Sequence, residues 1–231
     1  MAEIRTSELN PNIALFNLES VNSSYNKYIN SIHPDYISNE APTTSSFTPE
    51  NIVDVVSGRF EGEKILAYGI THYKYSDCNS KDLVDVGGGI KVHTKCKAAF
   101  EKMQAAAKKD GVNIYIVSGF RSEKYQINVF KKKFANKEYP TPDEFQKRLR
   151  FSAPSGFSEH HTGLAIDINS TEQSFANTKE YEWLKENAHK FGFEISFPEN
   201  GKQGLGFEPW HWRYVGDEES KEIFEAARKG L

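Results

Sequence analysis

Two short segments of the chain carry side chains that are suited to a single metal site. Residues 158–167 read S-E-H-H-T-G-L-A-I-D, and residues 208–211 read E-P-W-H. A catalytic zinc ion takes three protein ligands and keeps a fourth position for water. His160, Asp167 and His211 would supply three such ligands, and a glutamate lies close to the last one. The pattern predicts a metal site assembled from two distant parts of the sequence.

Both segments alternate polar and apolar residues with the two-residue period of a β-strand. Asp167 shares one strand face with Ala165 and Asn169, while leucine and isoleucine side chains form the other face. His211 and Arg213 likewise share the face opposite three aromatic side chains. An acid between two isoleucines is costly to bury without a cation or a hydrogen-bonding partner. We therefore expect Asp167 and His211 to point into a polar space while the apolar faces form core.

Each of these residues also has a purely structural interpretation. A histidine beside aromatic residues is more often a hydrogen-bonded core residue than a ligand, and Asp167 could instead pair with a lysine or an arginine. The metal hypothesis rests on the combination, with Gly163 allowing the chain to turn between His160 and Asp167. His161 competes with His160 for the role of ligand, and spacing alone does not choose between them.

Length and charge limit the classes of protein to consider. The chain has 231 residues, of which 38% are hydrophobic and 26% charged, and it suits one globular domain with an appended segment. Residues 1–50 are polar and weakly periodic, so we expect an N-terminal arm or linker there and a domain over 51–231. The net charge of -3 gives no basic excess for binding nucleic acid. No apolar run approaches the roughly 20 residues of a transmembrane helix.

Periodicity and capping signals predict a mixture of helices and strands. Strands are expected over 64–71, 112–118, 164–169 and 210–215, and helices over 93–110, 123–135, 179–191 and 218–229, with a short helix after Thr141. Three glycines at 87–89 match no phosphate-binding loop, so we expect a tight turn. The elements do not alternate regularly, which favours an α+β fold.

The two cysteines are Cys78 and Cys96. A bridge between them would stabilise the fold by roughly 3 kcal/mol in the chain-entropy model and would indicate an oxidising compartment. Two free thiols are the alternative, and the sequence does not decide. Residues 1–10 lack the basic and apolar segments of a signal peptide, although a mature chain that has lost its leader would look the same.

Three motifs, taken in order, resemble those of the VanY-like D-alanyl-D-alanine carboxypeptidases. They are S-G-F-R-S at 118–122, the segment at 158–167, and E-P-W-H-W-R-Y at 208–214. This family belongs to a wider group of zinc peptidases that includes lysostaphin-type enzymes and the hedgehog signalling domain. The resemblance covers roughly residues 85–231. It implies a hedgehog/DD-peptidase-like fold with a small, mostly antiparallel sheet flanked by helices.

The resemblance also implies roles for individual residues. The family pattern places zinc ligands at His160, Asp167 and His211, and the catalytic carboxylate at Glu208. Arg121 is expected to polarise the scissile carbonyl, stabilise the oxyanion and bind substrate. Without the family, a surface ion pair would be the favoured interpretation of Arg121.

Three further positions are interpreted through the same resemblance. Gln126 and Ser158 match residues that hold the substrate's terminal carboxylate in related enzymes, with a helix-surface amide and a turn hydroxyl as the structural alternatives. His161 stands where related sequences often have glutamine. We expect it to lie just outside the ligand set or to face solvent.

The implied function is zinc-dependent removal of a C-terminal D-alanine from peptidoglycan stem peptides, with Glu208 as the general base. An L,D-carboxypeptidase, an endopeptidase or a dipeptidase of the same group are the alternatives within the class, and E-P-W-H favours a carboxypeptidase. A non-catalytic zinc-containing binding module is the alternative from another class, which the presence of Glu208 and Arg121 disfavours. Such a substrate places the protein outside the cytoplasm of a bacterium.

Overall fold

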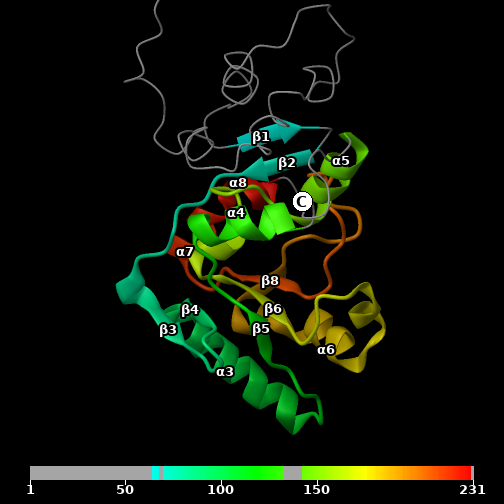
Figure 1. Ribbon diagram of the computed structural model, residues 1–231. Helices are drawn as coiled ribbons and strands as arrows, with labels where there is room; N and C mark the ends of the chain where they lie inside the picture. Colours follow the sequence, from blue (N-terminus) through cyan, green and yellow to red (C-terminus); the bar gives the residue numbers. More distant parts are fainter. Residues whose placement is uncertain (1–63, 68–69, 133–141, 230–231) are drawn as a thin grey trace, which may run out of the picture.

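The computed structural model describes residues 64–67, 70–132 and 142–229 (Figure 1). The arm predicted for residues 1–50, the predicted domain boundary at 51 and the cap at Thr141 lie outside this range. Among the helices in the described part of the chain, none combines the length and the apolar character that crossing a membrane requires.

A four-stranded antiparallel sheet forms the centre of the fold. Its strands are β5 (Ile116–Ser118), β6 (Ala165–Ile168), β8 (His211–Tyr214) and β7 (Phe193–Ile195), in the order β5-β6-β8-β7. The register between β6 and β8 places Asp167 opposite His211. The two segments that carry the predicted ligands are therefore adjacent strands, and the α+β class with a small antiparallel sheet is confirmed.

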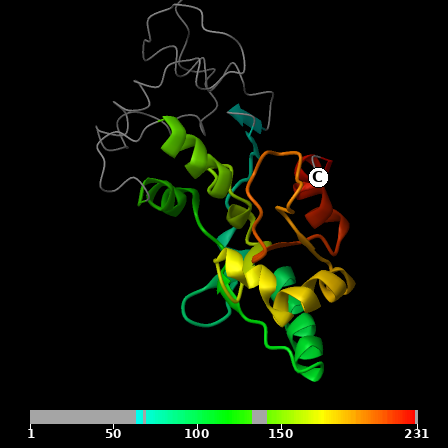
Figure 2. The same ribbon diagram turned by 90° about the vertical axis from the view of Figure 1, so that its right-hand side faces the viewer.

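The two faces of this sheet have different partners. Ile166, Ile168 and Trp212 belong to a core that also includes buried side chains of α3 (Thr94–Lys109) and α6 (Lys179–Asn187). The helices α4 (Glu123–Lys132) and α5 (Pro142–Phe151) lie on the opposite side of the sheet from α3 (Figures 1 and 2). Polar strand residues face that second side, as the alternation predicted.

Local sequence signals explain the main helices. The buried residues of α3 recur at helical spacing, and they are Cys96, Phe100, Met103 and Ala107. His93 caps its start, where the ring accepts a hydrogen bond from the Lys95 amide. Thr178 caps α6 as predicted, by accepting from the Tyr181 amide.

Several boundaries differ from the sequence-based expectations. The predicted helix over 179–191 ends at Asn187 and continues as a 3-10 turn, Ala188–Phe191. The predicted helix over 218–229 divides at Phe224 into α7 (Glu218–Ile223) and α8 (Glu225–Lys229). Phe224 is fully buried, which favours a local change of direction over a straight amphipathic helix.

The strands outside the central sheet form two hairpins. The single strand predicted over 64–71 is wrong, because β1 (Lys64–Ala67) pairs antiparallel with β2 (Ile70–Tyr73). A second hairpin joins β3 (Leu83–Asp85) to β4 (Lys91–His93). The glycines at 87–89 form its tight turn as predicted, and all three have positive φ. The strand predicted over 112–118 begins only at Ile116, and β7 was not predicted at all.

The two cysteines are free thiols in this structure. Cys96 is completely buried in the core face of α3, whereas Cys78 is half-buried in a loop. Burial raises the pKa of the Cys96 thiol far above its usual value. The alternative of a stabilising bridge is therefore not the one that the fold adopts.

Candidate active site

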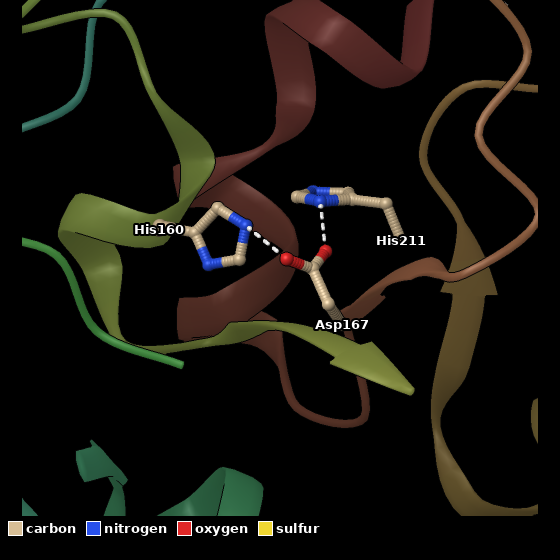
Figure 3. A group of neighbouring side chains, drawn as sticks. All are labelled: His160, Asp167 and His211. Atoms are coloured by element: carbon tan, nitrogen blue, oxygen red, sulfur yellow. Dashed lines mark hydrogen bonds and ion pairs between the residues drawn. The ribbon is translucent and has the colours of Figure 1, made fainter. Parts of the chain in front are cut away.

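The three predicted metal ligands meet on the polar side of the central sheet (Figure 3). His160 lies in the 3-10 turn Glu159–Thr162, Asp167 on β6 and His211 on β8. All three are buried, and one ligand atom from each lies within 4.8 Å of the others. Gly163, with φ of 66°, adopts the left-handed conformation that turns the chain from the first ligand towards the second.

The hydrogen bonds of His160 leave one ring nitrogen available. Its Nδ1 lies 2.7 Å from the carbonyl oxygen of Gly119, so Nδ1 must carry the proton that is donated. Nε2 is buried and has no hydrogen-bond partner in the described part of the chain, although Asp167 Oδ2 lies 3.4 Å away. Burial, together with the charge of Arg121, lowers the pKa of His160 to about 4. The ring therefore stays neutral and presents a lone pair to the site.

His211 is held between two carboxylates. Its Nδ1 lies 3.0 Å from Asp167 Oδ1, and its Nε2 lies 3.1 Å from Glu159 Oε2. Burial alone would lower the pKa of His211, but these two acids raise it to about 10. Burial would raise the pKa of Asp167, but His160 and His211 hold it far below its usual range.

These contacts fit a bound zinc ion. Two imidazoles and a carboxylate are a common ligand set of catalytic zinc, and a zinc-bound histidine usually donates its other N–H to an oxygen acceptor. The Gly119 carbonyl and the Glu159 carboxylate are such acceptors for His160 and His211. The unpartnered Nε2 of His160 marks where a cation would complete the arrangement.

Glu159 is a buried acid whose importance the sequence did not reveal. Its Oε2 accepts hydrogen bonds from His211 and from Ser196 Oγ at 2.5 Å, and its Oε1 accepts from Arg213 Nη1 at 2.8 Å. Burial would raise the pKa of Glu159, but Arg213 and His211 lower it to about 2. Arg213 is fully buried and also contacts Glu194 at 2.8 Å. One feature of the sequence could have revealed the importance of Glu159. It directly precedes His160, in a segment whose other residues are suited to burial.

The predicted catalytic carboxylate lies beside the ligands. Glu208 Oε2 is 4.0 Å from His211 Nδ1, and the residue is 9% exposed. Burial, reinforced by the charge of Asp167, raises the pKa of Glu208 to about 7 despite the opposing effect of His211. A carboxylate with such a pKa can both accept and return a proton near neutral pH.

Arg121 lines the same space from the turn between β5 and α4. Its backbone amide donates to the His160 carbonyl at 3.1 Å, which ties this turn to the ligand segment. The Nε atom of Arg121 is buried without a partner among the described residues. Burial lowers the pKa of Arg121, while Asp167 and Glu208 oppose that effect.

His161 does not face the predicted ligands or the solvent. It is 0% exposed, and its Nδ1 lies 2.6 Å from the Arg121 carbonyl oxygen. Its Nε2 accepts a hydrogen bond from the Gly156 amide at 3.1 Å. The neutral ring therefore connects the Arg121 turn to the loop that precedes Ser158, and His160 is the histidine that meets the other ligands.

The two residues expected to hold a terminal carboxylate occupy different positions. Ser158 is buried and lines the cavity beside the predicted ligands. Gln126 is 1% exposed and is not among the cavity's lining residues. Its Nε2 donates to the Ala153 carbonyl at 2.7 Å, so Gln126 supports the cavity wall from behind.

The site opens into a cavity of about 910 Å³. Its lining includes the predicted ligands with Arg121 and Glu208, and also residues of α5, a helix that lies away from the strands β6 and β8 (Figure 1). The size is typical of a pocket for a small molecule or a short peptide.

Comparison with known proteins identifies the family. The sequence model described as "VanY: D-alanyl-D-alanine carboxypeptidase" matches residues 89–217. The chain therefore belongs to the VanY D-alanyl-D-alanine carboxypeptidase family.

Curated relatives and solved structures agree with this assignment. The chain is 31% identical to a D-alanyl-D-alanine carboxypeptidase of Enterococcus faecalis (62% of this chain, 55% of the relative). It is 37% identical to the putative carboxypeptidase YodJ of Bacillus subtilis (54% of this chain, 46% of the relative). The chain thus spans about half the length of these two relatives.

Three solved structures share the fold. VanYB in complex with D-alanine-D-alanine has a TM-score of 0.53 and 31% identity, over 67% of this chain and 85% of that chain. The LdcB LD-carboxypeptidase has a TM-score of 0.54 and 31% identity, over 68% and 80%. A vancomycin-resistance D,D-pentapeptidase VanY mutant in complex with Zn(II) has a TM-score of 0.52 and 30% identity, over 64% and 88%.

Proposed function

We propose that this protein is a zinc-dependent carboxypeptidase that removes a C-terminal D-alanine from peptidoglycan stem peptides. The observation that carries the proposal is the meeting of His160, Asp167 and His211 with Glu208 at one end of a single cavity. Membership of the VanY family supports it, as do relatives named as D-alanyl-D-alanine carboxypeptidases. The substrate implies an extracytoplasmic place of action.

In this proposal His160 Nε2, a carboxylate oxygen of Asp167 and His211 Nδ1 would hold the zinc ion. When bound, zinc acts as a Lewis acid and lowers the pKa of water from 15.7 to about 7. Solved structures of the family include a complex with Zn(II) and a complex with D-alanine-D-alanine. The burial of all three ligands excludes bulk water from their hydrogen bonds.

Two residues of the chain then act on the reacting groups, one by transferring a proton and the other by stabilising negative charge. Glu208 accepts a proton from the attacking water and returns it to the nitrogen of the departing D-alanine. The guanidinium of Arg121 stabilises the negative charge that develops on the carbonyl oxygen. Ser158 lies in the cavity to bind the terminal carboxylate, and Gln126 contributes by holding the segment around Ala153 in place.

The similarity to the LdcB LD-carboxypeptidase keeps L,D-specificity as the second candidate. A dipeptidase fits less well, because the cavity continues from the ligands to α5 and leaves room for residues upstream of the scissile bond. A purely binding role fits less well too, because Glu208 and Arg121 both lie beside the ligands.

The decisive experiment incubates the purified protein with defined pentapeptides and tetrapeptides and identifies the products by mass. We expect release of one D-alanine, loss of that activity after removal of metal by a chelator, and recovery with one equivalent of zinc. Bound zinc without hydrolysis of any stem peptide would contradict the proposal and support a binding module.

A further inference from the structure

The part of the cavity lining that belongs to α5 is positively charged. Lys147, Arg148 and Arg150 of α5 line it, and we call these three residues the basic wall. Lys147 and Arg150 are exposed, and Arg148 is half-buried. No ion pair joins any of them to an acid within the described ranges. Three cations beside an accessible cavity form an attractive site for an anion.

The helix that carries the basic wall is held firmly against its neighbours. Arg148 Nη2 donates to the Val129 carbonyl at 2.8 Å, and its guanidinium lies 5.7 Å from the centre of the Phe130 ring. His72 Nε2 lies 3.0 Å from the carbonyl oxygen of Leu149. These contacts orient the helix before a ligand arrives, which reduces the cost of binding.

The C-terminal end of α5 is fixed to a second loop. The amide of Gly206 donates to the Arg150 carbonyl at 2.8 Å. A side chain at Gly206 would collide with the ring of Phe151, since its Cβ would lie 2.1 Å from a ring carbon. Lys147, Arg150 and Phe151 are spaced i, i+3 and i+4, so they share one helix face, and all three line the cavity.

The cavity is therefore bipolar. Asp167, Glu159 and Glu208 belong to the part of the lining with the predicted ligands, whereas the basic wall belongs to α5, away from β6 and β8 (Figure 1). Glu172 is a further acid in the cavity lining. Burial chiefly, and secondarily the charge of Arg121, lowers the pKa of Arg148 to about 10, while Glu208 opposes this effect. A ligand that matches this cavity presents its reacting amide at one end and an anionic group at the other.

We infer that the basic wall binds a carboxylate carried by the peptide upstream of the scissile bond. The protein would then prefer stem peptides whose third residue has a free carboxylate in its side chain over those whose third residue has an amine alone. This inference rests on the proposed carboxypeptidase function and specifies its substrate. The terminal carboxylate belongs instead to the end with Ser158 and Arg121, because it lies one residue beyond the scissile amide. An extended peptide advances about 3.3–3.6 Å per residue, so upstream groups point away from that end.

The test uses two synthetic pentapeptides that differ only at the third residue, meso-diaminopimelate in one and lysine in the other. We expect kcat/KM to be about ten-fold higher for the diaminopimelate peptide, mainly through KM, because each exposed ion pair contributes about two- to five-fold. Equal rates, or faster cleavage of the lysine peptide, would overturn the inference. Cleavage of neither peptide would instead overturn the proposed function.

Variants of the basic wall assign the effect to its residues. The double variant Lys147→Gln/Arg150→Gln should lose most of the preference, because its kcat/KM on the diaminopimelate peptide falls more than its kcat/KM on the lysine peptide. Lys102→Gln removes an exposed charge from α3, away from the cavity, and should keep the preference. The single variant Arg150→Gln, with its fold checked by circular dichroism, covers the case of an unstable double variant. A preference that survives in both folded wall variants would contradict the assignment.

Discussion

The two ends of the cavity are built in different ways. Around the predicted ligands, Glu159 and His161 are buried and each connects two or more neighbours by hydrogen bonds, whereas His160 Nε2 and Arg121 Nε are buried without a partner among the described residues. At the basic wall, the charged groups Lys147 and Arg150 are exposed. The contrast suggests that the first end determines chemistry, which tolerates little movement, and that the second end determines which peptide is bound.

The largest expected effect is at Glu208. The variant Glu208→Ala should reduce kcat by about 10²–10⁴-fold, because it removes the general base. Zinc content, measured by atomic spectroscopy, should be unchanged, since Glu208 is not among the three predicted ligands. Glu186→Ala, at an exposed position on α6, is the matched control. Near-normal turnover in Glu208→Ala would contradict the assignment of this residue as the general base.

The next-largest effect is expected at Glu159, whose carboxylate accepts a hydrogen bond from the predicted ligand His211. Glu159→Gln keeps the shape but replaces the charged acceptor of His211, so we expect zinc affinity to fall about 10–100-fold. Competition with a chromogenic chelator measures the affinity directly, without any reference to activity. Ser196→Ala, which removes a neutral donor to Glu159, should have a smaller effect in the same direction. Unchanged affinity in both variants would show that Glu159 serves the fold alone.

A third prediction concerns His72, whose ring contacts the helix that carries the basic wall, and the pH dependence of the stability of the fold. Burial lowers the pKa of His72 to about 4, so the folded state holds this ring neutral. The unfolded chain, with an ordinary pKa near 6.5, takes up the proton first, so stability is present above pH 6.5 and is lost as pH falls towards 4. Between pH 7 and pH 5 this loss amounts to about 2 kcal/mol.

The measurement is urea unfolding of the wild type and of His72→Gln at several pH values. The glutamine amide can still donate to the Leu149 carbonyl but does not titrate, so the variant should lose less stability on acidification. His189→Gln, at an exposed position, should follow the wild-type curve. Parallel pH profiles for wild type and His72→Gln would rule out the buried neutral histidine as a source of acid sensitivity.

The smallest expected effect is at His161. His161→Ala removes the link between the Arg121 carbonyl and the Gly156 amide, and we expect kcat/KM to fall about ten-fold through misplacement of Arg121. His161→Gln should recover most of the loss, because one amide group both donates and accepts. Zinc affinity should stay close to wild type in both variants. A glutamine variant as impaired as the alanine variant would argue against this hydrogen-bonding role.

The sequence was sufficient for the parts that depend on local pattern. Strand alternation around Asp167 and His211 predicted polar side chains opposite an apolar face, and the register of β6 and β8 brings them together. The α+β class also followed, since strand and helix periods are visible within a few turns of chain. The resemblance added the predicted role of Arg121, which spacing alone did not contain, whereas the position of Glu208 just before His211 already indicated a carboxylate close to the metal.

Only the tertiary structure decided the contacts between distant residues. Glu159 meets Arg213 and Ser196, which lie 54 and 37 positions away, and no local period signals such a pairing. The same holds for the link from His161 to the Arg121 turn and for the cavity wall that α5 forms. Local periodicity determines which face of an element is polar, whereas packing determines which polar groups meet. The sequence thus predicted a metal site with three ligands, and the fold decided what holds those ligands in place and which charges face the substrate.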